Sequence, residues 1–380
     1  MRYLKLLLNQ KFRCSSLSNW KNLIVVANNS NILQSRFLSQ DSSHYDPLKL
    51  RTDMEELFLD KRVRFLLKRL TGYNPEKLFE RKSLQNLSSP KYRFMTDEQL
   101  RMERETSNKM AEKMLQMPPV KYAKELVPRV LEKDSALEGF LDSSVKMIFL
   151  DATPGFSDID RLIVVREADG TLREATRDER HRTNQIFYPI EERHIDLPKM
   201  FEDPYTDDVL KREAYKLLLD NACLHFEPED ERFINLCHRT YDHIASRHAF
   251  DSLLSTRHYG GMVYYYVYFR RVDHLLHYLV CENRLENAFQ LLQLFYIVNP
   301  SENVPISWND SQSTDIPLSK LEEFNQNEGQ LVSITLEQFV NLLKFYIAND
   351  SSNLAVKPRL QLNLQKLEEQ LIDDSEVAKN

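Results

Sequence analysis

The sequence contains few glycines and few cysteines. Only 7 glycines and 4 cysteines occur among 380 residues. Doubly wound sheets and barrels need many tight turns, for which glycine is favoured, so the low count favours a mainly α fold. Cys14, Cys223, Cys237 and Cys281 are too sparse for a disulfide framework and lack the paired short spacings of a zinc site. We therefore expect reduced, buried thiols.

Acidic residues are missing from the first forty positions. This stretch has six Lys and Arg residues, no Asp or Glu, and many serines and leucines. Such a composition is typical of a mitochondrial transit peptide. We therefore predict a transit peptide over residues 1–40, cleaved near Arg36-Phe37-Leu38-Ser39, and a location in the mitochondrial matrix. The alternative is a disordered N-terminal tail.

Long apolar runs are also absent. The runs Leu6–Leu8 and Leu23–Ala27 are too short to span a bilayer, so no membrane contact is expected. Without the six cations of the predicted transit peptide, 45 basic residues remain against 57 acidic ones, a net charge of −12. Proteins held mainly by phosphate contacts carry basic surfaces, because phosphate neutralisation supplies most of their affinity. We expect protein partners, with nucleic acid contacted only at local patches.

Two such patches stand out. A helix predicted from Thr52 to Leu70 carries the densest cationic cluster of the chain after residue 40, which consists of Lys61, Arg62, Arg64, Lys68 and Arg69. Farther along, Lys91, Tyr92 and Arg93 alternate cations with an aromatic ring, a pattern that suits stacking and phosphate contact. The alternatives are a solvated helix face for the first patch and a packed arm for the second.

The pattern of apolar runs, prolines and turn residues predicts the domain organisation. Apolar runs at Val145–Leu150 and Leu162–Val165, with a turn at Asp169-Gly170, predict a small antiparallel β element. Thr96 with Gln99, and Thr176 with Glu179, form capping boxes that begin helices. After the transit peptide we predict an extended N-terminal helical arm over residues 41–144, a β-hairpin/α module over 145–200, a helical-hairpin array over 201–300, a linker over 301–330, and C-terminal helices with an acidic tail over 331–380.

The helices expected in the array are joined by short turns. They span Asp208 to Leu224, Asp230 to Arg247, Ala249 into the aromatic stretch described below, Val272 to Asn283, and Leu285 to Val298.

No combination of residues indicates catalysis or a cofactor. His274, His277 and Cys281 fall on one side of a predicted helix, but a metal site needs further ligands, and none lies at a suggestive spacing. There is no Walker loop, and Gly260-Gly261 lacks the third glycine and the preceding strand of a dinucleotide fold. We therefore expect no metal, no cofactor, no small-molecule substrate and no enzymatic activity.

The array is organised around an aromatic stretch, Leu253 to Phe269. It combines Arg257 with the only adjacent glycine pair and a nearly unbroken aromatic and aliphatic run. Alternation favours a strand, whereas the helices expected on both sides favour a helix. We prefer the helix, with Gly260 and Gly261 admitting another backbone at close range and with Met262, Tyr265, Tyr266 and Phe269 on one packed side. Arg257 is then the candidate for an outside contact.

Residues Ser255 to Tyr265 carry a family signature. An arginine and aromatic residues followed by Gly260-Gly261-Met262-Val263 resemble the mitochondrial small-ribosomal-subunit protein number 22 family. Further similar segments follow the same order over roughly residues 65–300: Leu70-Thr71-Gly72, Lys91-Tyr92, Met95-Thr96, Met117-Pro118-Pro119-Val120, Ile163-Val164-Val165-Arg166-Glu167, Gly170-Thr171-Leu172-Arg173, Phe226-Glu227-Pro228 and Thr240-Tyr241.

The resemblance implies a non-catalytic structural component of the mitoribosome small subunit, a ribonucleoprotein that supports mitochondrial translation. It implies contacts with other small-subunit proteins and limited contact with rRNA, and it transfers no active-site residues. The alternative is a helical adaptor of the mitochondrial matrix that does not bind the ribosome.

Overall fold

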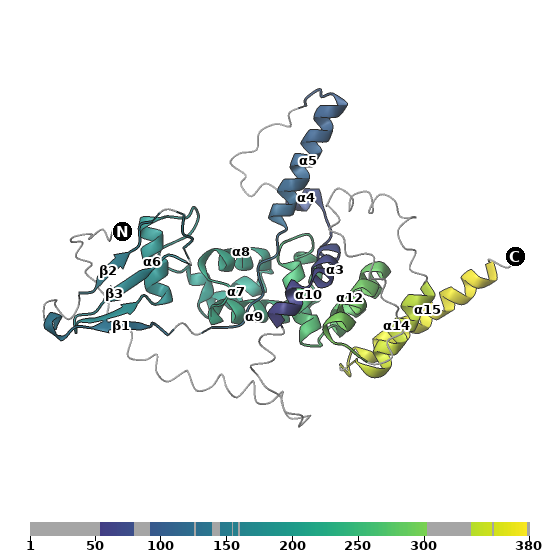
Figure 1. Cartoon of the computed structure of the whole chain (residues 1–380). Coiled ribbons are helices and arrows are strands. Elements are labelled where there is room, and N and C mark those ends of the chain that lie inside the picture. Colours follow the sequence, from purple (N-terminus) through teal and green to yellow (C-terminus); the bar gives the residue numbers. More distant parts are fainter. Residues whose placement is uncertain are drawn as a thin grey trace. The chain divides into compact units, whose positions relative to one another are not determined.

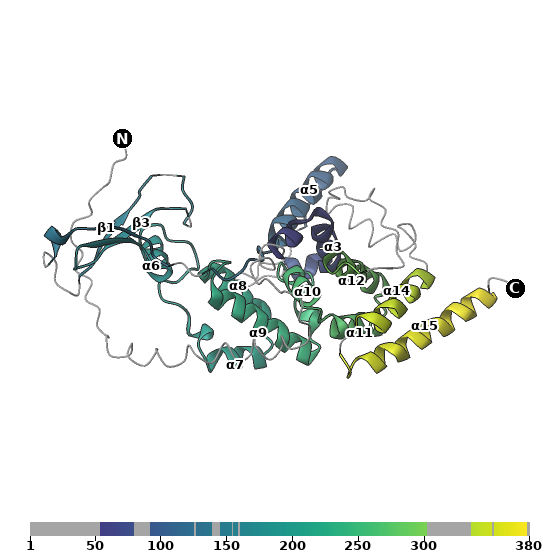
Figure 2. The same ribbon diagram turned by 60° about the horizontal axis from the view of Figure 1, so that its bottom comes forward.

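The computed structural model describes residues 54–79, 92–124, 127–138, 145–153, 155–158, 160–301, 336–351 and 353–377. The predicted transit peptide, Lys91 and almost all of the predicted linker lie outside these ranges. The chain divides into two compact units, whose described parts lie in Lys124–Pro198 for the first and in Lys49–Ala123 and Lys199–Asn380 for the second. The predicted mainly α fold with a small antiparallel sheet in the middle is confirmed (Figures 1 and 2).

The first unit contains a four-stranded antiparallel sheet. Its strands are β1 (Val130–Lys133), β2 (Met147–Leu150), β3 (Ile163–Arg166) and β4 (Thr171–Glu174), in the order β1-β4-β3-β2. The sequence predicts β2, β3 and β4 but not β1. All four residues of β1 are exposed, and its sequence, Val-Leu-Glu-Lys, does not alternate apolar and polar residues, so it lacks the pattern by which a half-buried strand is predicted. It is fixed instead by pairing with β4.

The turn between β3 and β4 lies at Asp169-Gly170, as predicted. Gly170 has a φ of 79°, which favours glycine, and its N–H donates to the carbonyl of Glu167 at 3.1 Å. A Cβ at this position would lie 2.0 Å from the carbonyl oxygen of Asp134, which caps the short 3-10 segment that follows β1. Glycine therefore permits both the turn and the approach of a neighbouring backbone.

Helix α6 (Arg177–Phe187) lies beside this sheet and begins at the predicted capping box of Thr176 and Glu179 (Figures 1 and 2). Glu179 also accepts from Arg173 of β4 at 2.8 and 2.9 Å and from Lys146 at 3.2 Å. Burial alone would raise the pKa of Glu179, but these donors and the N–H of Thr176 lower it to about 2. One carboxylate therefore both caps the helix and ties it to the sheet.

The second unit is helical. After a helical turn at residues 54–59, it contains α3 (Lys61–Thr71), α4 (Pro75–Leu78), α5 (Asp97–Met114), α7 (Tyr205–Lys211), α8 (Tyr215–His225), α9 (Glu231–Arg247), α10 (Tyr259–Tyr268), α11 (Asp273–Cys281), α12 (Leu285–Val298), α14 (Leu336–Asn349) and α15 (Lys357–Val377). Among the described residues, none of the helices combines the length and the apolar character needed to cross a bilayer.

Two of the predicted array helices are wrong in extent. The single helix expected from Asp208 to Leu224 is two helices, α7 and α8, because Glu213 adopts a left-handed φ of 58° that ends the first. The helix expected from Ala249 is a short 3-10 turn at Phe250–Ser252 followed by a loop, and α10 begins only at Tyr259. In contrast, the predicted bounds of α9 and α12 are confirmed.

Helix α3 packs against α10 and α12, far from it in the sequence (Figure 1). Val63, Leu67 and Leu70 form its fully buried side. The N–H of Asp60 ends the preceding turn, and the Asp60 side chain accepts from the N–H of Arg62 at 2.8 Å and caps α3. The apolar side of a highly charged helix therefore completes the core of the helical unit.

Candidate functional site

Helix α10, which contains the predicted packed side, is buried all round. Every residue from Tyr259 to Val267 is buried, Met262, Tyr265 and Tyr266 among them. Phe269, which we expected on the packed side, lies at the C-terminal cap and is 44% exposed. Burial therefore surrounds the helix instead of following one side, because α3 and α12 pack against it in addition to the aromatic contacts from α9.

The glycine pair of α10 admits side chains and not the backbone that we expected. A Cβ at Gly260 would lie 2.1 Å from Sδ of Met117 and 3.6 Å from Oγ1 of Thr71. A Cβ at Gly261 would lie 3.3 Å from the hydroxyl oxygen of Tyr241. The sequence does not predict the contact between Met117 and Gly260. Met117 follows the end of α5, and nothing in its spacing points to a glycine so far along the chain.

The tyrosines of α10 bind backbone groups of other elements. The hydroxyl of Tyr264 donates to the carbonyl of Met54 at 2.7 Å, and that of Tyr266 donates to the carbonyl of Tyr241 at 2.6 Å. Burial raises the pKa of both hydroxyls above the usual value, so both remain protonated donors near neutral pH. Through these two hydrogen bonds, α10 connects the helical turn at residues 54–59 to α9.

Arg257 is not free for an outside contact in the way that we expected. Its guanidinium lies 2.8 Å from Oδ1 of Asp220 in α8, and Nε2 of His258 donates to the same oxygen at 2.9 Å. Burial alone would raise the pKa of Asp220, but His258 and Arg257 hold it below its usual value. The arginine therefore orders the loop that precedes α10, which gives it a structural role.

The structure divides the basic cluster of α3 into two groups. Three of its cations form intramolecular ion pairs: Arg62 with Asp60 at 3.2 Å, Lys68 with Glu112 at 3.2 Å, and Arg69 with Glu286. Lys61 and Arg64 are exposed and have no ion-pair partner among the described residues. Lys61 and Arg64 are therefore the members of this cluster that form no intramolecular ion pair among the described residues.

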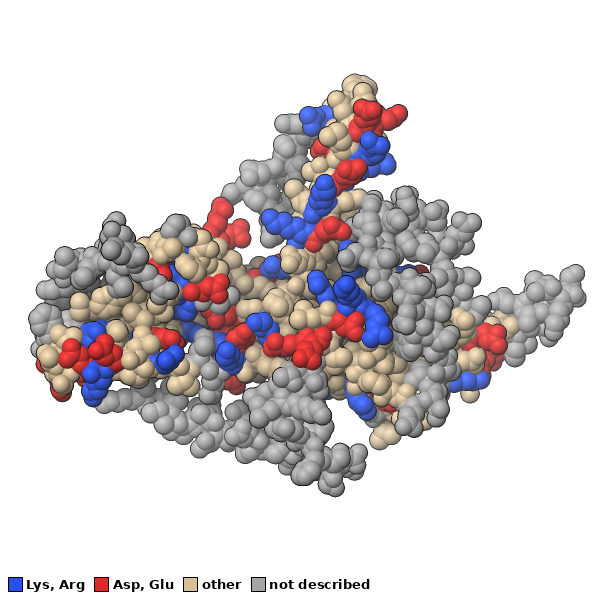
Figure 3. Space-filling model, in the orientation of Figure 1, with Lys and Arg blue, Asp and Glu red and all other residues tan. Residues whose placement is uncertain are grey.

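The segment before α5 projects its side chains into solvent. Tyr92 is 93% exposed, and Arg93 and Phe94 are also exposed. Helix α5 begins at the predicted capping box of Thr96 and Gln99, and Ala111 is its one buried residue. Cationic and acidic side chains are interspersed along α5 (Figure 3). This part of the chain is available to a partner, but the charges of α5 do not favour an anionic one.

The His274, His277 and Cys281 set faces α15. Nε2 of His274 lies 3.0 Å from Nδ2 of Asn353, and Nδ1 of His277 lies 3.1 Å from Nδ2 of Asn363. No group of three or more His, Cys, Asp or Glu side chains is placed to hold a metal ion within the described ranges. Sγ of Cys281 lies 3.5 Å from Nδ1 of His277 and 3.8 Å from Nε2, and Asn363 contacts both Nδ1 and the sulfur, whereas in a catalytic triad the orienting group and the nucleophile contact opposite ring nitrogens. Cys281 is exposed and Cys223 half-buried, so the prediction of buried thiols holds only for Cys237 among these three.

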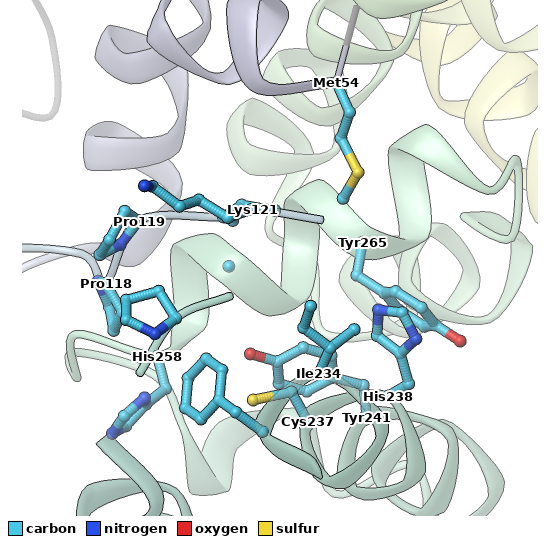
Figure 4. A pocket seen from close by; sticks show the side chains of 14 residues that line it. Met54, Pro118, Pro119, Lys121, Ile234, Cys237, His238, Tyr241, His258 and Tyr265 are labelled. Atoms are coloured by element: carbon cyan, nitrogen blue, oxygen red, sulfur yellow. The ribbon is translucent and has the colours of Figure 1, made fainter. Parts of the chain in front are cut away.

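A cavity of about 60 Å³ lies between α9, α10 and the extended segment of Pro118 and Pro119 (Figure 4). Its wall is mainly apolar and includes the ionisable residues Cys237 and His238. Burial raises the pKa of the Cys237 thiol, and burial lowers the pKa of His238 to about 4. At neutral pH the thiol is therefore protonated and the imidazole uncharged, which does not suit a nucleophile.

Comparison with known proteins assigns the family. Residues 56–300 match the family model described as "Mitochondrial 28S ribosomal protein S22". The chain belongs to the mitochondrial 28S ribosomal protein S22 family. It is 30% identical over 292 residues to small ribosomal subunit protein mS22 of Mus musculus, which covers 77% of this chain and 80% of the relative. It is also 30% identical over 283 residues to mS22 of Bos taurus, which covers 74% of this chain and 78% of the relative.

The S22 match spans both units of the fold. It begins just before α3, includes the sheet and α6, and ends just after α12. The S22 family is a family of mitochondrial structural ribosomal proteins and not of enzymes. The buried α10 and its neighbours are therefore parts of the scaffold of this fold.

Proposed function

We propose that the chain is a structural component of the small subunit of the mitochondrial ribosome, located in the matrix and supporting mitochondrial translation. The match of residues 56–300 to the S22 family carries this proposal. A transit peptide over residues 1–40 would deliver the protein to that compartment, as its basic composition without acidic residues indicates.

Protein contacts dominate the proposed assembly. The chain after residue 40 has a net charge of −12, since 45 basic residues stand against 57 acidic ones. An acidic protein repels the rRNA backbone over most of its surface, so neighbouring subunit proteins provide most of the binding. Exposed apolar side chains on α5, such as Met102 and Met110, suit such contacts.

Co-sedimentation tests this function against the adaptor alternative. In mitochondria that express a tagged full-length chain, we expect the protein to migrate with intact small subunits in a sucrose gradient. A matrix adaptor that does not bind the ribosome would remain in the top fractions, and that result would refute the proposed function. A known small-subunit protein in the same gradient verifies that the particles are intact.

Contact with rRNA is proposed at the exposed cations. Lys61 and Arg64 are exposed on one helix without internal ion pairs, so phosphate binding would not break any ion pair of the folded chain. Arg93 and Tyr92 provide a second patch, where a cation lies beside a ring able to stack on a base. We include Lys91 in this patch because it directly precedes Tyr92 in the sequence, although it lies outside the described residues.

Reversing the charge of Lys61 and Arg64 should weaken incorporation in a salt-dependent manner. Each lost phosphate contact removes about one unit from the slope of log affinity against log salt, so Lys61→Glu with Arg64→Glu should lower the slope by about two. The measurement is the fraction of protein retained on small subunits over a series of KCl concentrations.

The matched control changes the net charge equally at the end of α7, through Lys211→Glu with Arg212→Glu, two exposed cations outside the proposed contact surfaces. We expect this control to be retained like the wild type. If the α3 variant is also retained like the wild type at every salt concentration, Lys61 and Arg64 do not contact rRNA.

A further inference from the structure

The contact of α11 with α15, and with Asn353 just before α15, depends on two uncharged imidazoles. The Nδ2 amide of Asn353 lies 3.0 Å from Nε2 of His274, and that of Asn363 lies 3.1 Å from Nδ1 of His277. An amide nitrogen can only donate, so each imidazole nitrogen must accept. A nitrogen that accepts a hydrogen bond carries no proton, so with the two amides oriented in this way both imidazoles are neutral in the docked state.

The amide orientation of Asn353 is fixed by its other contacts. Its Oδ1 accepts from the N–H of Ala355 at 3.0 Å, and its own N–H donates to Oδ2 of Asp273 at 2.9 Å. A flip of the amide to face a protonated His274 would break the bond to Ala355. Protonation of His274 would therefore bring two donors face to face and break the contact with Asn353.

The groups around the two imidazoles are mainly cationic. Burial lowers the pKa of both His274 and His277, and Arg359 of α15 and His248 at the end of α9 lower it further. Asp273 opposes this effect at His274, but its carboxylate already accepts from Tyr346 and Asn353. The thiol of Cys281 is a further titratable group at this contact, since its Sγ lies 3.5 Å from Nδ1 of His277.

The apolar contribution of α15 to docking is small. Leu360 and Leu367 are its buried residues within the part whose side chains are described, and Val356 is buried just before the helix. By comparison, α14 buries six residues and holds Asp273 through the hydroxyl of Tyr346 at 2.7 Å. Helix α15 also packs against α14, where Lys344 pairs with Glu368 at 2.5 Å, and the histidine–asparagine contacts add a polar attachment to α11.

We propose that α15 is an acid-sensitive latch on α11, docked there while His274 and His277 are neutral and released from α11 when they take up protons. The sign follows from linkage. The released state binds protons more readily than the docked state, so docking is fully stable above the usual imidazole pKa of about 6.5 and weakens as the pH falls below it. Because the docked state holds both imidazoles neutral, protonation of a released histidine of ordinary pKa about 6.5 favours release by up to about tenfold at pH 5.5.

Hydrogen exchange of the full chain, followed by mass spectrometry at pH 7.5 and pH 5.5, tests the latch. Rates are divided by the intrinsic exchange rate of each peptide, and peptides of α10 serve as the internal reference. We expect the protection of α15 to fall roughly tenfold at pH 5.5 while that of α10 changes little. An equal loss of protection in α10 and α15, or no loss in either, would overturn the proposal.

Two sets of substitutions separate the histidines from other titrating groups. His274→Gln and His277→Asn place an amide oxygen where each imidazole nitrogen accepts but remove the titration, so the double variant should keep α15 protected at pH 5.5. Asn363→Asp places an anion beside His277, so its α15 should be better protected at pH 5.5 than that of the wild type. If the double variant loses protection as the wild type does, or if Asn363→Asp has no effect, the two histidines are not the sensors and the proposal fails.

Discussion

Asp273→Ala is expected to lower the free energy of unfolding of the helical unit by roughly 3 kcal/mol. Asp273 is buried at the first position of α11, where its carboxylate accepts from the hydroxyl of Tyr346 at 2.7 Å and from the N–H of Asn353 at 2.9 Å. Alanine leaves the buried hydroxyl of Tyr346 and the half-buried N–H of Asn353 without an acceptor. It also removes a negative charge from the N-terminus of a helix, where the aligned peptide dipoles favour one.

The effect should be greatest in the C-terminal helices. Burial and the neighbouring Asp273 raise the pKa of Tyr346 above its usual value, so the tyrosine is a protonated donor at neutral pH. Tyr346→Phe is the matched control, because it removes one donor and leaves the carboxylate with Asn353. We expect a loss of only about 1 kcal/mol for this variant.

Urea titrations followed by helical circular dichroism give the two free energies, and hydrogen exchange shows whether α14 loses protection first. A loss below about 1 kcal/mol for Asp273→Ala, or one no larger than that for Tyr346→Phe, would show that water replaces the lost acceptor.

Local signals in the sequence predict local structure well. The capping boxes at Thr96 and Thr176 each combine two short-range hydrogen bonds between residues three positions apart, so a four-residue window is sufficient to identify them. The Asp169-Gly170 turn is similar, because the required φ belongs to one residue. The α7–α8 break is not predictable in this way, since Glu213 has no intrinsic preference for a positive φ.

Contacts between distant segments are not predictable from a single sequence. The apolar side of α3 is visible in the spacing of Val63, Leu67 and Leu70, but nothing in the spacing identifies α10 and α12 as its partners. The same limit applies to the basic cluster. Local charge density indicates an external anion, whereas the acidic partners of Lys68 and Arg69 lie in α5 and α12. Internal pairing thus reduces the exposed cations without ion-pair partners in this cluster to Lys61 and Arg64.

The aromatic stretch contains one feature that the sequence predicts and one that it does not. The prediction that Gly260 and Gly261 permit a close approach rests on the absence of a side chain, and the structure places Met117 and Tyr241 at these glycines. Which groups approach depends on the path of the chain after α5. That path includes Lys121, which pairs with Glu229 at 2.5 Å, and Tyr122, whose hydroxyl lies 2.9 Å from that of Tyr268.

Gly260→Leu should destabilise the helical unit by about 2–4 kcal/mol, because Cβ alone would lie 2.1 Å from Sδ of Met117 and the rest of the side chain has no space in a buried helix. The control is Gly261→Ala, whose Cβ meets only the Tyr241 hydroxyl at 3.3 Å and which gains about 1 kcal/mol of helix propensity. We expect a change within about 1 kcal/mol for this control.

Met117→Ala in the Gly260→Leu background decides whether the clash is the cause. Removal of the thioether makes room for the new side chain, so the double variant should be more stable than Gly260→Leu alone, with a coupling energy of at least about 1 kcal/mol in a double-mutant cycle. Urea midpoints of the four proteins provide the measurement. Strictly additive effects would mean that Met117 moves aside without loss, and the role of Gly260 would then be its backbone flexibility and not the space that it leaves for the segment after α5.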